Sequence, residues 1–225
     1  MILQTLRTGS KGNCYILTDD NGKHLILDAG VRSKEIKQTL NFDFSNVRGV
    51  LITHNHGDHS LSADDLELLG LDVFRPYLID SCMDKRTFGE YAVSSFPVEH
   101  DGEPCSGFLI RHINGFRMLY VTDLSYCKYT FGKQKVDAIL VEVNYQTKYA
   151  ETLAANYAHK IRGHFSLENC IEFLKANQTE KLKTVVICHN SNYTMDLNEC
   201  LSDIQAVVGD ETRVYAAEKE KVIEL

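Results

Sequence analysis

No stretch of the sequence approaches the roughly 20 consecutive apolar residues that a transmembrane helix needs. The opening residues, MILQTLRTGSKGN, also lack a basic start followed by a long apolar stretch and a small-residue cleavage site, the pattern of a secretory signal. The hydrophobic fraction of 44% and the charged fraction of 24% are ordinary for a soluble globular protein. We therefore expect a soluble, cytoplasmic protein with no membrane partner.

Paired cysteines are absent as well. The seven cysteines are odd in number, widely scattered and free of any CxxC motif. This distribution argues against a disulfide framework and against a thiolate zinc finger. A reducing compartment fits it best, in agreement with a cytoplasmic location.

The chain has little proline and no excess of positive charge. With three prolines, no low-complexity tract and no repeat, nothing marks a domain boundary, so we expect one domain over residues 1–225. The net charge of −7 disfavours a protein that coats nucleic acid or a membrane surface through bulk electrostatics. This net charge does not exclude a local cleft that binds phosphate.

Hydrophobic patterning predicts an α/β fold. Apolar runs bounded by turn residues predict strands over residues 1–6, 13–19, 24–30, 47–53, 137–144, 184–190, 213–217 and 221–225, and a hairpin over residues 108–123. Helical spacing covers residues 33–40, 60–70, 166–176 and 197–209. Because strands fill the first half and alternate with helices in the second, we predict two mixed sheets packed together and covered outside by helices.

Two local signals refine this assignment. Ser33 stands where its hydroxyl can cap the first helix, and Ser166 opens the third. Asn114 and Gly115, between the two apolar runs of the hairpin, are the preferred pair of a type I′ turn.

The residues THNHGDHS, at positions 53–60, place three histidines and an aspartate at the end of a predicted strand. On an extended segment His54 and His56 project to the same side and can grip one ion. Gly57 has no side chain and allows the chain to turn sharply before Asp58 and His59, so the loop can serve two ions. A histidine-rich surface loop without metal is the alternative, but the buried-looking strand that leads into the loop favours a site on a rigid scaffold.

The donor types indicate which metal such a loop binds. Imidazole and carboxylate without cysteine suit zinc first, with manganese or iron as alternatives. A hydrolytic site of this kind keeps one coordination position open for water.

The residues HNHGDH, from His54 to His59, resemble the HxHxDH signature of the metallo-β-lactamase superfamily. The further ligands expected of that family follow in order at His100, Asp123 and His189. The resemblance implies a four-layer αββα sandwich of two mixed sheets flanked by helices, with a dinuclear metal centre at one edge.

The resemblance also implies how the ligands are shared between two divalent ions. For one ion the implied ligands are His54, His56 and His100. For the other they are Asp58, His59 and His189, with Asp123 as the bridge. A pair of ions about 3.5–4 Å apart can hold a hydroxide between them, lower its pKa and stabilise charge on the attacking and leaving oxygens, so the implied chemistry is hydrolysis.

The segments TGSKGNCYIL and HLILDAGV resemble the N-terminus of the YycJ/WalJ-like branch of that superfamily, and phage-encoded relatives look similar. The later segments HDGEPCSGFLI, VTDLS, LVEVNYQ, KIRGHFS and ICHNS fall in the same order. Members of the branch are linked to 5′-end-directed degradation of DNA. The resemblance therefore implies a phosphodiesterase or nuclease whose partner is nucleic acid or another phosphodiester.

Asp58 and His164 are the predicted catalytic residues. More distant relatives place a histidine shortly before the last metal-binding histidine, and His164 in RGHFS occupies the comparable place. Near the metals it can bind a phosphate oxygen or protonate the leaving group, and Lys160 and Arg162 beside it can help to neutralise phosphate. A helix-entry histidine that only hydrogen-bonds its own loop is the alternative.

Four further residues are expected to support the site. Asp28 ends an apolar strand and is predicted to fix a ligand histidine from behind, the alternative being an ordinary turn aspartate. Ser10 and Asn13 are expected to shape the loop beneath the site through side-chain to backbone hydrogen bonds. Glu142, at another strand end, is expected to buttress the site.

Several alternatives to a DNA nuclease stay open. The same metal centre serves thioester and lactone hydrolases of the glyoxalase II type and small cyclic-nucleotide phosphodiesterases. A metal-loaded module that binds phosphate-bearing ends without cutting them is the non-enzymatic alternative.

The negative net charge is in tension with a nuclease. A set of cations in the segment that would approach the site can offset it locally, or can belong to an ordinary solvated surface. The set is Lys128, Lys133, Lys135, Lys148, Lys160 and Arg162.

Overall fold

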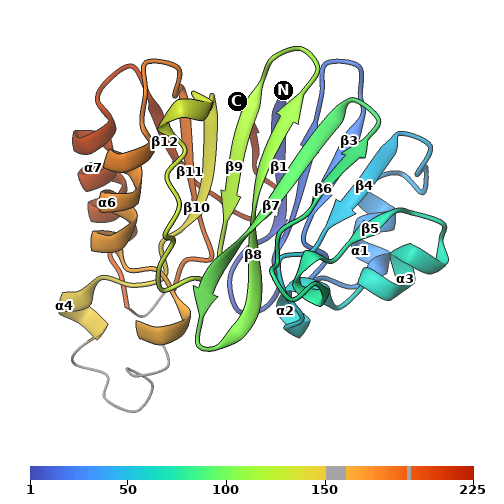
Figure 1. Cartoon of the computed structure of the whole chain (residues 1–225), viewed down its shortest axis with the longest axis horizontal. Helices are drawn as coiled ribbons and strands as arrows, with labels where there is room; N and C mark the ends of the chain where they lie inside the picture. The colour runs from blue at the N-terminus through green and yellow to red at the C-terminus, as the bar shows by residue number, and fades with distance from the viewer. Residues whose placement is uncertain (151–160, 192–193) are drawn as a thin grey trace.

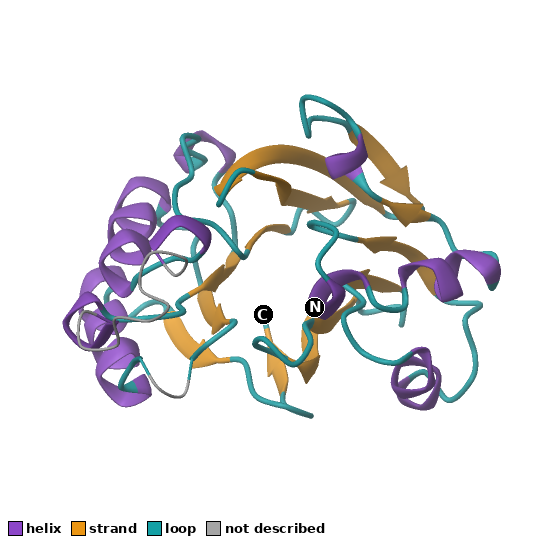
Figure 2. Cartoon of the chain, turned by 90° about the horizontal axis from the view of Figure 1, so that it is seen from below, coloured by secondary structure: helices purple, strands orange, loops and turns teal. Residues whose placement is uncertain are grey.

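The computed structural model describes residues 1–150, 161–191 and 194–225. In these parts of the chain two β-sheets face each other, and helices cover their outer faces (Figure 2). Both sheets contain parallel and antiparallel pairs, as the sequence predicts.

The first sheet combines the N-terminal strands with the last strand of the chain. Its order within the described residues is β13 (Val222–Glu224), β1 (Ile2–Arg7), β2 (Cys14–Thr18), β3 (His24–Leu27), β4 (Val47–Leu51) and β5 (Val73–Phe74). Pairing is antiparallel from β13 to β3 and parallel from β3 to β5.

The second sheet is built from the middle and the C-terminal part of the chain. Its order within the described residues is β12 (Arg213–Ala216), β11 (Thr184–Cys188), β10 (Ala138–Glu142), β9 (Arg117–Val121), β8 (Glu103–His112), β7 (Tyr91–His100) and β6 (Lys85–Phe88). Pairing is parallel from β12 to β9 and antiparallel from β9 to β6.

Helices lie at the two ends of the long axis of the molecule (Figure 1). At one end are α6 (Leu167–Asn177) and α7 (Leu197–Val208), and at the other are α1 (Ser33–Thr39) and α3 (Ala63–Leu68). Shorter elements are α2 (Gly57–Ser60), α4 (Thr147–Ala150), η1 (Pro76–Leu78) and η2 (Gly132–Gln134). Among the described segments, none of the helices combines the length and apolar character that crossing a bilayer requires.

Three apolar layers hold the sheets and helices together. Side chains alternate along β10, so that Ile139 and Val141 pack with the residues of α6 and α7 while Leu140 faces the other sheet. A third layer joins the first sheet to α1 and α3, through Ile36 and Leu66. Full burial of one such aliphatic side chain is worth roughly 1.5–3 kcal/mol, which is why strands covered on both faces read as continuous apolar runs.

Every strand and helix predicted from the sequence is present, with bounds that shift by a few residues. The helix expected over residues 60–70 is shorter, because α3 begins at Ala63 and a separate turn of helix, α2, precedes it. Strands β5, β6 and β7 were missed. β7 contains Pro97, which argues against a strand in sequence, but Pro97 lies beyond the residues of β7 that pair with β6 and therefore occupies an edge.

The prediction that Ser33 caps α1 was wrong. Ser33 lies inside the helix, and its N-cap is Arg32, which makes no side-chain capping hydrogen bond. The prediction for α6 is confirmed, since Ser166 is the N-cap and its side chain accepts a hydrogen bond from Asn169 N at 3.1 Å.

The turn between β8 and β9 also differs from the prediction. A type I′ turn needs positive φ at both central residues, but of Asn114 and Gly115 only Gly115 has positive φ, at 96°. His112 O accepts a hydrogen bond from Gly115 N at 3.0 Å, so the turn lies one residue earlier and Gly115 follows it in the left-handed region. The hairpin itself is formed as expected.

Removing the N-cap of α7 tests how local capping contributes to this fold. The Asp196 side chain accepts a hydrogen bond from Glu199 N at 3.1 Å. Loss of such a cap costs about 1 kcal/mol, so Asp196→Ala should lower Tm by roughly 2–4 °C in a chain of this size. The control Asp203→Ala alters an exposed aspartate within the same helix and should not lower Tm, because alanine favours helix. Equal Tm values for the two variants in circular dichroism melts would contradict the capping role.

Candidate metal centre

Polar residues gather where strands that run in the same direction end. β9, β10 and β11 are parallel neighbours, and Asp123, Glu142 and His189 stand at their carboxyl ends. In the first sheet the parallel strands β3 and β4 lead into Asp28 and His54. Because parallel strands bring their carboxyl ends to one side of a sheet, residues that are distant in sequence meet there. α2 lies at this side, at the bottom of Figure 1.

Three of these residues have left-handed backbone conformations. The φ angle is 55° at Asp28, 51° at Asp123 and 50° at His189. Non-glycine residues pay of order 1–3 kcal/mol for such a conformation, which persists only where the surrounding structure enforces it. Each position comes within two residues of a strand end, so the strained turn redirects the side chain away from the strand.

The first group of donor atoms consists of three histidines. His54, His56 and His100 offer ring nitrogens that lie within 4.8 Å of one another. His100 Nδ1 lies 2.7 Å from Gly163 O, and His54 Nδ1 lies 3.0 Å from Thr53 Oγ1. These contacts occupy Nδ1 of His54 and of His100 and leave the Nε2 atoms of these two rings for a ligand.

The second group contains Asp58, His59 and His189, with donor atoms also within 4.8 Å of one another. Asp58 Oδ2 lies 3.6 Å from His59 Nε2 and 3.8 Å from His189 Nε2. Asp123 joins the two groups, because its carboxylate lies 3.0 Å from His59 Nε2 and clusters with His54 and His59.

This geometry fits metal ions. In a tetrahedral zinc site with bonds of 2.0–2.1 Å, neighbouring donors lie roughly 3.3 Å apart, and His100 Nε2 lies 3.3 Å from His56 Nδ1. His54 Nε2 is buried with no hydrogen-bond partner among the described residues, a costly state unless an ion takes it up. His189 Nδ1 approaches Asp123 Oδ2 to 2.8 Å without hydrogen-bond geometry. The clusters are therefore consistent with a dinuclear metal site.

Asp28, which follows β3, lies behind the second group. Its Oδ2 atom lies 2.7 Å from His59 Nδ1, which leaves His59 Nε2 pointing toward the donor cluster. Thr53 N donates to the same carboxylate at 2.8 Å and the Tyr120 hydroxyl donates at 2.5 Å. Thr53 and Tyr120 were missed from the sequence, since nothing in a strand pattern marks which hydroxyl meets a buried carboxylate.

Glu142 supports the opposite side of the cluster. It is fully buried, and its Oε1 atom lies 2.8 Å from His164 Nδ1 and 3.2 Å from His189 Nδ1. Its Oε2 atom accepts hydrogen bonds from Leu124 N and Phe165 N. One carboxylate thereby contacts two imidazoles and also fixes the backbone just after Asp123 and just after His164.

The buried charges shift one another's pKa values. Burial alone would lower the pKa of His59, but the carboxylates of Asp123 and Asp28 override it and hold that pKa well above its ordinary value. By the same balance, Asp123 raises the pKa of His189 to about 10. Burial would likewise lower the pKa of His164, and the Glu142 carboxylate raises it. At His54 the Asp123 carboxylate does not offset burial, which together with the neighbouring histidines holds its pKa well below that of a free imidazole.

The two residues expected to shape the loop beneath the site, Ser10 and Asn13, differ in their contacts. Asn13 Oδ1 accepts from Gly9 N at 2.8 Å, Asn13 N donates to Asp58 O at 2.7 Å, and Asn13 Nδ2 lies 2.9 Å from His59 Nε2. Ser10 is exposed, and its hydroxyl has no hydrogen-bond partner among the described residues. The loop is therefore held by the asparagine.

The predicted substrate-binding cations are only partly placed. Lys160 lies outside the described residues. The Arg162 side chain pairs with Asp101 at 2.9 Å, next to His100. Of the other cations, Lys135 pairs with Glu180 and Lys148 pairs with Glu199. These pairs fit the solvated-surface alternative better than a phosphate-binding face.

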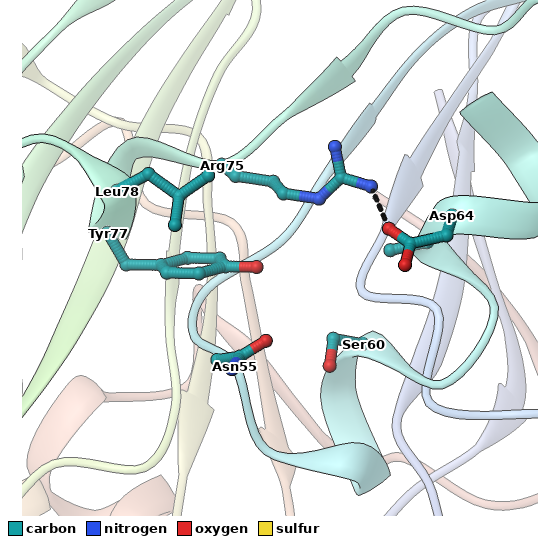
Figure 3. Close-up of a pocket in the computed structure, with 7 residues that line it drawn as sticks. Asn55, Ser60, Asp64, Arg75, Tyr77 and Leu78 are labelled. Carbon is teal, nitrogen blue, oxygen red and sulfur yellow. Dashed lines mark hydrogen bonds and ion pairs between the residues drawn. The ribbon is translucent and has the colours of Figure 1, made fainter.

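A pocket that the sequence did not suggest adjoins the metal loop (Figure 3). It has a volume of about 320 Å³ and is lined by Asn55, Ser60, Tyr77 and Arg75 among others. Arg75 is paired with Asp64 at 2.8 Å and with a second acid, Glu67, at 2.9 Å. The pocket therefore offers hydrogen-bonding groups but little free positive charge.

Comparison with known proteins shows which fold carries this site and which family model its loop matches. The model of the Metallo-beta-lactamase superfamily matches residues 7–70, which include the loop from His54 to His59. The crystal structure of the metallo-beta-lactamase fold protein YhfI from Bacillus subtilis matches with a TM-score of 0.73, over 99% of this chain and 98% of that one, at 14% identity. The chain has the metallo-β-lactamase fold, and the segment that matches the superfamily model carries the loop from His54 to His59.

Two further similarities are informative. The exodeoxyribonuclease YycJ of Bacillus anthracis is 31% identical over 145 residues, which are 54% of this chain and 53% of that protein. The match thus spans about half the length of that relative. Human tRNase Z, short form, matches with a TM-score of 0.63 at 16% identity, over 100% of this chain and 99% of that one. At such identities the structural matches show the shared fold alone.

The metallo-β-lactamase loop depends on a glycine other than the expected one. Gly57 has negative φ, and a Cβ atom there would meet nothing within 4 Å, so no steric reason requires glycine. A Cβ atom at Gly30 would lie 1.7 Å from Asp58 O and 2.7 Å from His59 N. The loop therefore rests directly on the backbone of Gly30.

Alanine at these two glycines should have opposite outcomes. Gly30→Ala is expected to displace the metal loop, to destabilise the fold by about 1–3 kcal/mol as overpacking does, and to lower bound zinc below one ion per chain. Gly57→Ala should keep wild-type stability and metal content, because the added methyl group meets open space. Thermal melts and elemental analysis of both proteins provide the test, and wild-type metal content in Gly30→Ala would contradict the close contact.

Metal binding should release protons. Since the pKa of His189 is about 10, its imidazole carries an extra proton at pH 8 when no metal is bound, and the raised pKa of His59 acts in the same direction. A histidine ligand must be neutral, so metal loading should release about one proton from His189 and metal affinity should rise as pH rises. Calorimetric titration of metal-free protein in buffers of different ionisation enthalpy measures this release. A heat of binding independent of the buffer would contradict it.

Proposed function

We propose that this metal-dependent hydrolase is a phosphodiesterase that degrades DNA from its 5′ ends. The observation that supports this most is the His164–Glu142 pair, 2.8 Å apart beside the metal ligands, because breaking a phosphodiester needs a proton donor for the leaving oxygen. The relative that is 31% identical is named an exodeoxyribonuclease, and the matching tRNase Z also bears the name of a nuclease.

Within this proposal each group of donors would hold one divalent ion. His54, His56 and His100 would hold the first ion. Asp58, His59 and His189 would hold the second, and the Asp123 carboxylate would serve both. Zinc suits these donors best, with manganese or iron as alternatives. When bound, the ions would activate a water molecule and neutralise charge on the phosphate.

Asp58 is assigned a second task besides ligation. Its side chain is 27% exposed, whereas the side chains of His59 and Asp123 are almost completely buried. It is thus the carboxylate of the group that faces the open side, where it can accept a hydrogen bond from the attacking water and orient it toward phosphorus.

His164 is assigned the proton for the leaving oxygen. Its pKa is raised by Glu142, so the ring is cationic at a higher pH than a free histidine. Its side chain is 16% exposed, which leaves one edge accessible to a substrate. Glu142 keeps the ring oriented, and the cation attracts the phosphate before it donates a proton. Arg162 and Lys160 are assigned to bind the phosphates of the approaching strand. To do so, Arg162 gives up its ion pair with Asp101.

The function is tested by cleavage of 5′-labelled strands with protein reloaded with zinc or manganese. Asp58→Asn should reduce cleavage by more than the roughly 10–100-fold that loss of an outer partner of a metal ligand costs. Asp203→Asn, on the exposed face of α7, is the matched control and should cut like the wild type. Product that shortens from the labelled end supports 5′ polarity, and Asp58→Asn that retains full activity would refute the assignment.

The choice of substrate is decided in the same assay by adding other compounds. Duplex DNA, single-stranded DNA and RNA are compared first, followed by a bis-aryl phosphodiester and an acyl thioester. Turnover of the thioester without cleavage of any phosphodiester would favour the glyoxalase II type of hydrolase. Binding of DNA ends without any product under either metal would favour a binding module.

A further inference from the structure

A groove of about 230 Å³ opens between residues 126–130 and α6. Its lining is aromatic, with Tyr126 and Tyr129 from the loop and Phe165 and Phe173 from the opposite side. The rings of Phe165 and Phe173 meet edge to face with centroids 6.1 Å apart, and both residues are buried. Tyr126 is 60% exposed. The groove therefore combines a fixed apolar floor with an accessible aromatic wall.

Both walls of the groove are hydrogen-bonded to residues in or next to the metal centre. Tyr126 O accepts a hydrogen bond from Glu99 N at 3.1 Å, and Glu99 directly precedes His100. Phe165 directly follows His164, and its amide donates to Glu142 at 3.1 Å. Backbone contacts thus fix each wall of the groove to residues of the metal cluster.

The amide and carboxylate side chains that line the groove already have partners. Asn169 Nδ2 donates to Ser125 O at 3.2 Å, Asn177 accepts from Phe131 N, and Glu172 pairs with Lys175. What remains for a ligand is aromatic surface. Such a surface selects a flat apolar ring system rather than a charged group.

A cation stands at the same place. Lys128 Nζ lies 5.4 Å from the centroid of the Tyr129 ring, and Lys128 is exposed. A cation interleaved with aromatic rings is the arrangement by which proteins hold a single nucleic acid strand, with phosphate on the cation and bases on the rings.

We propose that this groove binds one nucleobase of the substrate strand, next to the phosphodiester that lies on the metal centre. The inference rests on the proposed function and adds a subsite to it. The volume is below the 300–1,000 Å³ of pockets that enclose whole small ligands, so it suits one ring system. Bases inside a duplex are stacked on one another, so the strand must be single at the site of cutting. Stacking reads the face of a base, so little sequence preference is expected.

The test removes the ring from the protein and the base from the DNA, separately and together. Binding of the holoenzyme to a fluorescent single strand is measured by anisotropy, with phosphorothioate links at the end to slow cleavage. One strand is intact and the other is abasic over its terminal nucleotides. Tyr126→Ala should bind the intact strand about 10-fold more weakly, because the stacking of one base is lost, and should bind the abasic strand like the wild type. Tyr126→Phe should keep full affinity.

The control is Phe42→Ala, which removes a ring that is 67% exposed beyond α1, at the far end of the molecule from α6 (Figure 1). It should change neither affinity. Equal weakening of both strands by Tyr126→Ala, no weakening of either, or no binding of either strand by the wild type would overturn the subsite. Cleavage of the unmodified strand is scored separately, so a protein that discriminates bases without cutting would refute the nuclease and retain the groove.

Discussion

Three buried carboxylates, those of Asp28, Asp123 and Glu142, determine how the side chains at this end of the two sheets are arranged. A carboxylate removed from water costs several kcal/mol unless a partner compensates it. The imidazoles nearest to them are, in the same order, those of His59, His189 and His164. Because each pairing also orients a ring, the requirement to compensate buried charge places donor nitrogens around a common centre.

The fold supplies the positions at which this can happen. Parallel strands deliver Asp28, Asp123 and His189 to one side, and left-handed backbone at all three turns the side chains inward. The contact between Gly30 and Asp58 O seats the metal loop on the first sheet. The bond between His100 Nδ1 and Gly163 O ties the β7–β8 hairpin to the segment that carries His164. Charge compensation and backbone geometry thus support the same arrangement.

Much of this arrangement is readable from the sequence. Strands buried on both faces appear in the sequence as apolar runs. Metal donors that follow such runs, at residues 54–59, 100, 123 and 189, indicate a site before any contact is known. The features that could not be predicted from the sequence depend on tertiary contacts. The hydroxyl of Tyr120 bonds to Asp28, which is 92 residues away in sequence. Pro97 is tolerated because β6 pairs with β7 only as far as Ser94.

The same limit explains the errors. Gly57 looked necessary because it lies within the motif, whereas the glycine that the packing requires, Gly30, is remote in sequence. For surface cations such as Lys135 and Lys148 the sequence left a phosphate-binding group and a solvated surface equally open, because their acidic partners are distant in sequence. The aromatic groove joins residues 126–130 to α6, so no single stretch of sequence reveals it.

The central claim, that these donors form a centre for two metal ions, is tested most directly by anomalous diffraction at the zinc edge from crystals of zinc-loaded protein. The account predicts two peaks about 3.5–4 Å apart, one beside the three histidines led by His54 and the other beside Asp58, His59 and His189, with Asp123 between them. A single peak in fully loaded protein, or peaks away from these side chains, would contradict it.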